Sequence, residues 1–102
     1  MAATLQVIYP AAEGTSFDHD YYATTHMELV GKHMGDLIQS TVVTKGLTGG
    51  PRTAPGYHAV ATIIFADEAS LGAALKASGP LMADIPNFTD ATPQVLTGEV
   101  IG

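Results

Sequence analysis

The sequence predicts an α+β domain whose elements follow the order βαββαβ. Four short segments carry the alternating or β-branched pattern of strands, and two segments repeat apolar residues at helical spacing. The chain has 102 residues, a length that suits one compact domain, so residues 1–102 are predicted to form a single domain. Helices in this order cover only one face of a four-stranded antiparallel sheet. We therefore expect a ferredoxin-like sandwich whose other sheet face needs a partner.

The first strand is predicted at residues 4–9. Leu5, Val7 and Tyr9 alternate there with residues of the opposite face, as in a strand that packs one side on a core. Pro10 and the small residues after it end the strand.

The first helix is predicted at residues 18–34. The carboxylate of Asp18 can accept hydrogen bonds from the free N–H groups of the first turn, and Phe17 can pack onto Tyr22 one turn later. Gly35 is a natural C-terminal cap, because glycine adopts the left-handed conformation without strain.

The second and third strands are predicted at residues 37–45 and 57–65. The first of these is rich in β-branched residues, and the other is apolar on both faces, which indicates cover on both sides. The glycine- and proline-rich segment 46–56 between them is too long for a tight hairpin turn, so we expect a mobile loop.

A second helix is predicted to follow a cap at Asp67 or Ala66 and to run through Ala77, with Gly79-Pro80 as the stop. Residues 81–85 are expected to add one more turn.

The last strand is predicted at residues 94–101, after a loop at residues 87–92. Valine, leucine and isoleucine side chains recur along this final segment, as strands require.

Composition narrows the classes of partner. Ten acidic and four basic residues give a net charge of −6, and the basic residues are scattered, so nucleic acid is not an expected partner. The chain has no cysteine, which excludes disulfides and thiolate chemistry. A hydrophobic fraction of 46% with 14% charged residues indicates a second apolar surface, and on that ground we expect a homodimer.

The N-terminus carries no basic segment, and the longest apolar run, residues 59–66, is far shorter than the ~20 residues of a membrane span. We expect no membrane partner and a cytoplasmic protein.

The first predicted helix turns polar groups toward its apolar side. At 100° per residue, one arc of roughly 80° holds the residues His19, Tyr22, His26, Val30 and His33. Tyr21 falls on the opposite arc, so it is predicted to reach solvent or a dimer neighbour.

The histidines of this arc do not predict a metal site. Their seven-residue spacing separates them by ~10 Å along the helix axis, which one ion with bonds of ~2 Å cannot bridge. The segment 46–50 lacks the dinucleotide-binding fingerprint and joins two strands, so we expect no cofactor there.

Three segments resemble one family. They are Phe17-Asp-x-x-Tyr-Tyr-x-x-x-His26, the strand 57–65, and Ala83-Asp-Ile-Pro-Asn-Phe-Thr-Asp90. Together they are similar to the EthD family of dimeric α+β barrel proteins, over essentially the whole chain. The resemblance implies a homodimer in which two sheets form a barrel with the helices outside, and a cavity between sheet and helices in each protomer.

The resemblance also implies a place among catabolic accessory proteins, the group named for proteins encoded beside a fuel-ether monooxygenase. Similar barrels include cofactor-free monooxygenases, polyketide cyclases and muconolactone isomerases, so fold alone does not choose the chemistry.

His26 is the strongest candidate for a catalytic or ligand-contacting residue, because an imidazole on a buried face can exchange a proton near neutral pH. Tyr22 is predicted to orient it or to hydrogen-bond a ligand. The alternative is that both are packing residues, with His26 bonded only to a backbone carbonyl or to Tyr22.

Four further residues are predicted to bind the ligand. Val30 and His33 share the arc of His26, while Asp84 and Phe88 follow the second helix and could close over the cavity. The alternative for Asp84 is a turn cap, and for Phe88 a place at the dimer edge.

Three functions remain open from the sequence. The first is an accessory protein of a degradative or secondary-metabolic pathway that binds a small apolar metabolite between sheet and helices. The second is a cofactor-independent enzyme, an oxidoreductase such as a monooxygenase, an isomerase or a cyclase, with His26 as acid/base. The third is an assembly subunit without a ligand.

Overall fold

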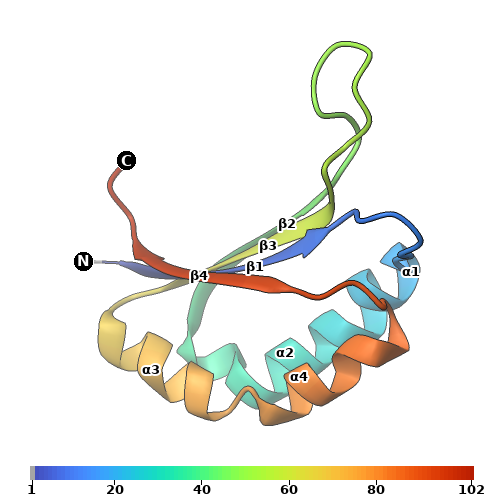
Figure 1. The fold of residues 1–102 in the computed structure, drawn as a ribbon. Helices are drawn as coiled ribbons and strands as arrows, with labels where there is room; N and C mark the ends of the chain where they lie inside the picture. The colour runs from blue at the N-terminus through green and yellow to red at the C-terminus, as the bar shows by residue number, and fades with distance from the viewer. Residues whose placement is uncertain (1) are drawn as a thin grey trace.

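The structure, a computed structural model, describes residues 2–102. Its strands are β1 (Ala3–Pro10), β2 (Ile38–Lys45), β3 (Tyr57–Phe65) and β4 (Gln94–Glu99). They form one antiparallel sheet in the order β2-β3-β1-β4. The helices all lie on one face of this sheet (Figure 1), which confirms the predicted ferredoxin-like α+β fold.

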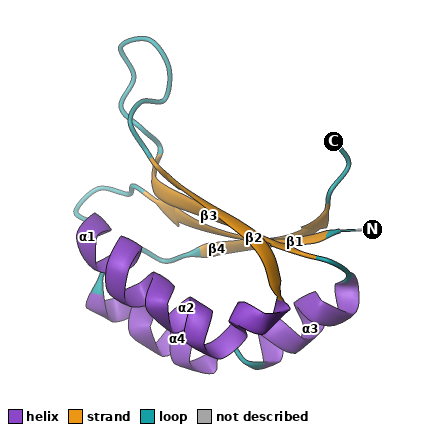
Figure 2. Ribbon diagram, turned by 180° about the vertical axis from the view of Figure 1, so that it is seen from behind, coloured by secondary structure: helices purple, strands orange, loops and turns teal. Residues whose placement is uncertain are grey.

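The helical layer contains two stretches of chain, seen from behind in Figure 2. The first has α1 (His19–Tyr21), a π-helical turn (Tyr22–His26), α2 (Met27–Met34) and a 3-10 turn (Gly35–Leu37). The second has α3 (Glu68–Lys76), α4 (Gly79–Asp84) and a 3-10 turn (Ile85–Asn87). No helix within residues 2–102 is long and apolar enough to cross a membrane.

Two helix ends differ from the prediction. Gly35 keeps a right-handed conformation, with φ −56°, because the chain continues into a 3-10 turn instead of reversing at a left-handed glycine. α3 ends at Lys76, one residue before the predicted end at Ala77, and Gly79 and Pro80 begin α4, since proline is favourable in the first turn of a helix.

The core lies between the sheet and the helices. Alternate residues of β3, Ala59, Ala61, Ile63 and Phe65, are buried against the helical layer, and the residues between them are only half-buried. No helix within residues 2–102 packs on the second face of β3 (Figure 1), so the cover predicted for that face remains a prediction about a partner. The outward face of the sheet is left with apolar side chains, among them Ile8, Val42, Val60, Ile64 and Leu96.

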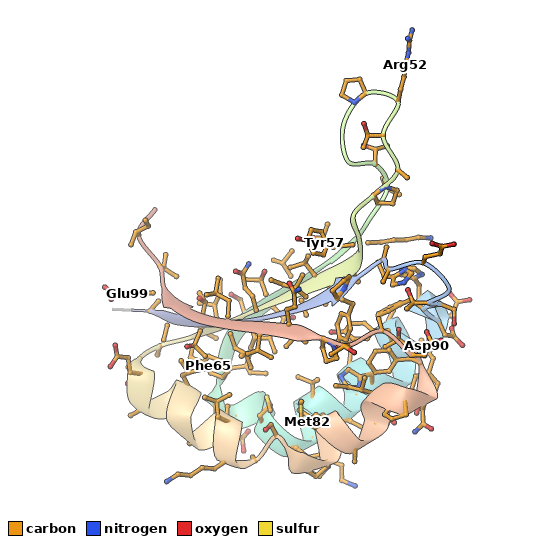
Figure 3. The ribbon with its side chains drawn as sticks, viewed as in Figure 1. Arg52, Tyr57, Phe65, Met82, Asp90 and Glu99 are labelled. Atoms are coloured by element: carbon orange, nitrogen blue, oxygen red, sulfur yellow. The ribbon has the colours of Figure 1, made fainter. Side chains whose placement is uncertain are left out.

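The segment 46–56 projects from the sheet on the side away from the helices (Figure 1). Arg52 stands at its tip, remote from the helical layer (Figure 3), and adopts a positive φ of 57°. Gly50 and Thr53 form an isolated antiparallel β-bridge that closes a small turn within this segment.

Candidate functional site

The first helical stretch carries the candidate site and begins at the predicted cap. The Asp18 carboxylate accepts a hydrogen bond from the Tyr21 N–H at 3.0 Å. A single continuous α-helix was expected from here, yet the next turn is π-helical, and the Met27 N–H reaches the carbonyl of Tyr22 five residues earlier. The Thr24 hydroxyl donates to the Asp20 carbonyl at 2.7 Å. It thereby competes with the backbone N–H that would bond this carbonyl in an α-helix, and this competition favours the π-helical turn.

The π-helical turn changes which side chains face inward. It aligns residues five apart, so Tyr21 comes to the same side as His26. The Tyr21 hydroxyl donates to Oδ1 of Asp84 at 2.7 Å. The prediction that Tyr21 faces solvent or a dimer neighbour is wrong, because it assumed 100° per residue throughout.

His26 and Asp84 form a buried pair beneath this turn. Nδ1 of His26 lies 2.9 Å from Oδ2 of Asp84, and the residues are 5% and 7% exposed. Asn87 donates its side-chain N–H to Oδ1 of Asp84 at 2.9 Å. Asp84 thus accepts bonds from three side chains and is neither a turn cap nor a lid over a cavity.

The surroundings of Asp84 keep it ionised. Burial raises the pKa of its carboxyl, but hydrogen bonds from Asn87, Tyr21 and His26 outweigh burial and hold the pKa below its usual value. The Tyr21 pKa moves the other way, raised first by its bond to Asp84, so its hydroxyl keeps the proton that it donates.

The carboxylate also selects the tautomer of a neutral imidazole. A neutral His26 that donates its Nδ1 proton to Asp84 carries a lone pair on Nε2. Within residues 2–102 that second nitrogen has no hydrogen-bond partner, and no buried side-chain nitrogen or oxygen is sealed away without one. Nε2 is therefore the imidazole nitrogen that remains available to accept a hydrogen bond.

Aromatic rings hold this imidazole in place. The Tyr22 ring stacks on His26 at 4.9 Å between centroids, and Phe88 meets it edge-on at 4.7 Å. Burial raises the pKa of Tyr22 to about 12, against a smaller lowering by Tyr9, so its hydroxyl stays protonated at neutral pH. Phe88 is 3% exposed and packs among rings inside the chain, neither as an exposed lid nor at a dimer edge.

A small apolar cavity lies between the sheet and the helices. It measures about 50 Å³, and His26, Tyr22 and Val30 are among its lining residues. Water occupies about 30 Å³ in the liquid, so this cavity has room for a few ligand atoms only. Met27, Met34 and Met82 also line it, and unbranched methionine side chains rearrange readily. Met82 lies on α4 (Figure 3).

A larger groove opens beside the cavity. It measures about 410 Å³, within the usual range for ligand pockets, and it shares Tyr22 and Met27 with the cavity. Its lining comprises Phe17, His19, Asp20, Tyr22, Ala23, Met27, Val43, Lys45 and Ala59. Sequence patterns did not predict this groove, although an apolar Val43 two residues before Lys45 on an edge strand is a signal of it.

The structure brings together most of the residues predicted for the site. His26, Tyr22 and Val30 line the cavity, while Asp84 and Phe88 contact His26 without lining the cavity. His33 is half-buried on α2 and lines neither the cavity nor the groove. Within residues 2–102 no group of three histidine, cysteine or acidic side chains is placed to hold a metal ion.

Comparison with known proteins adds two findings. The family model of the EthD domain matches residues 13–92. A search of curated proteins found no match.

Three solved structures are similar to the chain. An EthD-like protein from Ralstonia eutropha JMP134 is 32% identical, with 99% of this chain and 93% of that chain covered and a TM-score of 0.90. An ethyl tert-butyl ether D (EthD) family protein from Bacillus halodurans C-125 is 23% identical, with 99% and 100% covered and a TM-score of 0.70. A dimeric ferredoxin-like protein of unknown function from Jannaschia sp. CCS1 is 18% identical, with 98% and 100% covered and a TM-score of 0.58.

Proposed function

The chain belongs to the EthD family, and from that premise we propose that it binds a small, largely apolar molecule against His26, between the sheet and the first helical stretch. The setting that we propose is an accessory role in a degradative or secondary-metabolic pathway. The observation that carries the proposal is the buried His26–Asp84 pair, whose free Nε2 belongs to a residue that lines an apolar cavity.

A buried carboxylate is an expensive group for a small core. Taking its charge out of water costs several kcal/mol unless hydrogen bonds compensate. Here Tyr21 and Asn87 supply such bonds to Asp84. A packing role for His26 would not require an ionised acceptor or leave Nε2 without a partner, so the arrangement favours a ligand contact at Nε2.

The volumes of the cavity and the groove indicate how a ligand fits. The cavity of about 50 Å³ admits only the end of a molecule, whereas the adjoining groove of about 410 Å³ accommodates its body. Tyr22 and Met27 form the boundary between the two. We propose that the Met27 side chain shifts when the ligand end enters the cavity, as the flexibility of methionine permits.

Proton transfer is the second candidate function, and the three bonds to Asp84 favour it. A carboxylate held ionised can stabilise the imidazolium that forms when Nε2 of His26 takes a proton from a carbon or oxygen acid. Return of the same proton to another atom of the molecule completes an isomerisation or cyclisation without a cofactor. A monooxygenase reaction would use the same base but needs dioxygen as co-substrate.

We further propose that the protein is a homodimer that pairs the helix-free faces of two sheets. Val42, Val60, Ile64 and Leu96 belong to this face, and no helix within residues 2–102 covers it (Figure 1). The cavity and the groove lie on the helical side, so this dimer leaves both open. The dimeric relative from Jannaschia sp. CCS1 has the same fold.

A thermal-shift screen tests the binding proposal. Small phenols, lactones, quinones and alcohols are screened against the wild type, His26→Gln and His33→Gln. The last variant is the control, because His33 belongs to the same helical stretch but lines neither the cavity nor the groove. A molecule that binds the native state raises the melting temperature by mass action. We expect hits with the wild type and His33→Gln that are lost in His26→Gln. Hits that raise the melting temperature of all three proteins equally would remove the binding role from His26.

The enzyme alternative needs a separate readout. Hits are incubated with the protein in deuterated water, and exchange of their acidic C–H protons is followed by NMR. Exchange that depends on His26 supports proton transfer, while bound hits without exchange support binding alone.

A further inference from the structure

The groove beside the cavity has a cation at its strand side. We propose that it takes an apolar anion, a molecule whose carboxylate or phenolate oxygen pairs with Lys45 while its apolar body points toward His26. This inference rests on the proposed binding function and names the chemical class of the ligand. The placement of Lys45, its lack of a partner and the shape of the groove each support it.

Lys45 faces the helical side of the sheet. It pairs across the strands with Ala59, and Val43 pairs with Ala61, and both alanines are buried against the helical layer. Because cross-strand partners point to the same face, Val43 and Lys45 point that way too. No helix covers this edge strand completely, which leaves Val43 40% exposed within a hollow of the surface.

The charge of Lys45 is not neutralised by any residue that the structure describes. It is one of only four basic residues against ten acidic residues. Within residues 2–102 the one ion pair at 4.0 Å or less joins His26 to Asp84, so no carboxylate reaches Lys45. A molecule that carries both an anionic group and an apolar body pairs with the ammonium group and also packs on the apolar wall beside it. It therefore binds more tightly than a molecule with only one of these two features.

The other polar residues of the groove set the direction of the anion. Asp20 also lines the groove and repels a negative group from its own position. Nε2 of His19 already has a partner, since it lies 3.1 Å from the His58 carbonyl oxygen and donates to it. Lys45 therefore remains as the free cationic donor, and the anionic end of the ligand belongs there.

The rest of the groove leads from Lys45 to the cavity. Ala59 and Met27 provide an apolar floor, and Met27 with Tyr22 forms the boundary shared with the cavity of His26. A molecule fixed at Lys45 by its anionic group thus directs its opposite end toward the cavity that His26 lines.

Two matched probes test the inference: 2-naphthoate and its neutral analogue 2-naphthamide, which differ in charge and hardly in shape. Their Kd values are measured by calorimetry for the wild type, Lys45→Met, Asp20→Asn and Arg52→Met. Arg52→Met is the control, because this substitution removes an equal charge at the tip of a distant loop (Figure 3). The imidazole signals of His26 are followed by NMR in the same titrations.

We expect the wild type to bind 2-naphthoate up to about fivefold more tightly than 2-naphthamide, the upper end of the range for an exposed ion pair. Lys45→Met removes this preference, Asp20→Asn increases it, Arg52→Met leaves it unchanged, and high salt weakens it. Equal affinities in the wild type, a preference that survives in Lys45→Met, or binding of neither probe would overturn the inference.

The same data separate this inference from the proposed function. Equal binding of both probes with shifts at His26 overturns the anion preference and leaves the binding function in place. A Lys45-dependent preference without shifts at His26 supports the anion groove and contradicts the contact with His26.

Discussion

Nδ1 of His26 and Oδ2 of Asp84 lie 2.9 Å apart although 58 positions separate the two residues in the sequence. The contact joins the π-helical turn of the first helical stretch to the end of α4. It links the fold to the proposed function, because the same carboxylate that ties the two helical stretches together also occupies Nδ1 and leaves Nε2 as the imidazole nitrogen available for a ligand.

Asp84→Asn is predicted to change how stability depends on pH. The folded pKa of Asp84 is lowered by the bonds from Asn87, Tyr21 and His26 despite burial, so its contribution is present above the unfolded pKa of about 3.9 and is lost as pH falls through the folded pKa. Urea unfolding from pH 2.5 to 7 should show a smaller acid-induced loss of stability in the variant. At pH 7 the variant should be less stable by about 1–3 kcal/mol.

The control for this experiment is Asp90→Asn, a substitution of an exposed acidic residue in the same part of the chain. Parallel pH curves for the wild type and Asp84→Asn would contradict the role assigned to the buried pair.

Phe88→Ala is predicted to destabilise the protein by about 3–5 kcal/mol, the range for removal of a buried phenylalanine. The ring is 3% exposed and packs against Tyr9, Tyr22 and His26. Denaturant melts measure the loss, and Phe88→Leu, which keeps most of the volume, should lose less. A loss below about 1 kcal/mol for the alanine variant would be inconsistent with a core position.

Ile64→Asp is predicted to break the proposed dimer. Ile64 is on the helix-free face of the central strand β3, where a carboxylate would be buried without a partner in the paired sheets. Sedimentation should give a dimer for the wild type at micromolar concentration and a monomer for the variant. Leu75→Asp, on the exposed side of α3, is the control and should remain dimeric.

A wild type that sediments as a monomer at micromolar concentration would refute the pairing of sheets. A dimeric Ile64→Asp variant would show that the copies associate through another surface.

Local sequence signals predicted much of the fold. β3 was expected at residues 57–65 and occupies Tyr57–Phe65, because apolar alternation and flanking glycine and proline act within a few residues. Asp18 caps the first helix as predicted, and Asp67 caps α3 by accepting from the Ser70 N–H at 2.8 Å. β4 ends at Glu99, two residues before the predicted end at residue 101.

The candidate site was predicted less completely, for a physical reason. The inward face of His26 and Tyr22 follows from helical spacing, but the π-helical turn that brings in Tyr21 depends on one added residue per turn and has no periodic signal. The partner of His26 is set by the packing of two distant helical stretches. Spacing therefore identified His26 but not the bonds that Asp84 makes.

The most direct test of the account is the protonation state of the His26 ring. Long-range proton–nitrogen NMR correlations of the four histidines are recorded at pH 7, with His26→Gln to assign the His26 signals and His33 as the internal reference. We predict that His26 is protonated on Nδ1, that Nε2 carries a lone pair, and that only Nε2 shifts when a screening hit is added. A ring protonated on Nε2 in the free protein, or a hit that binds without shifting Nε2, would contradict the central claim.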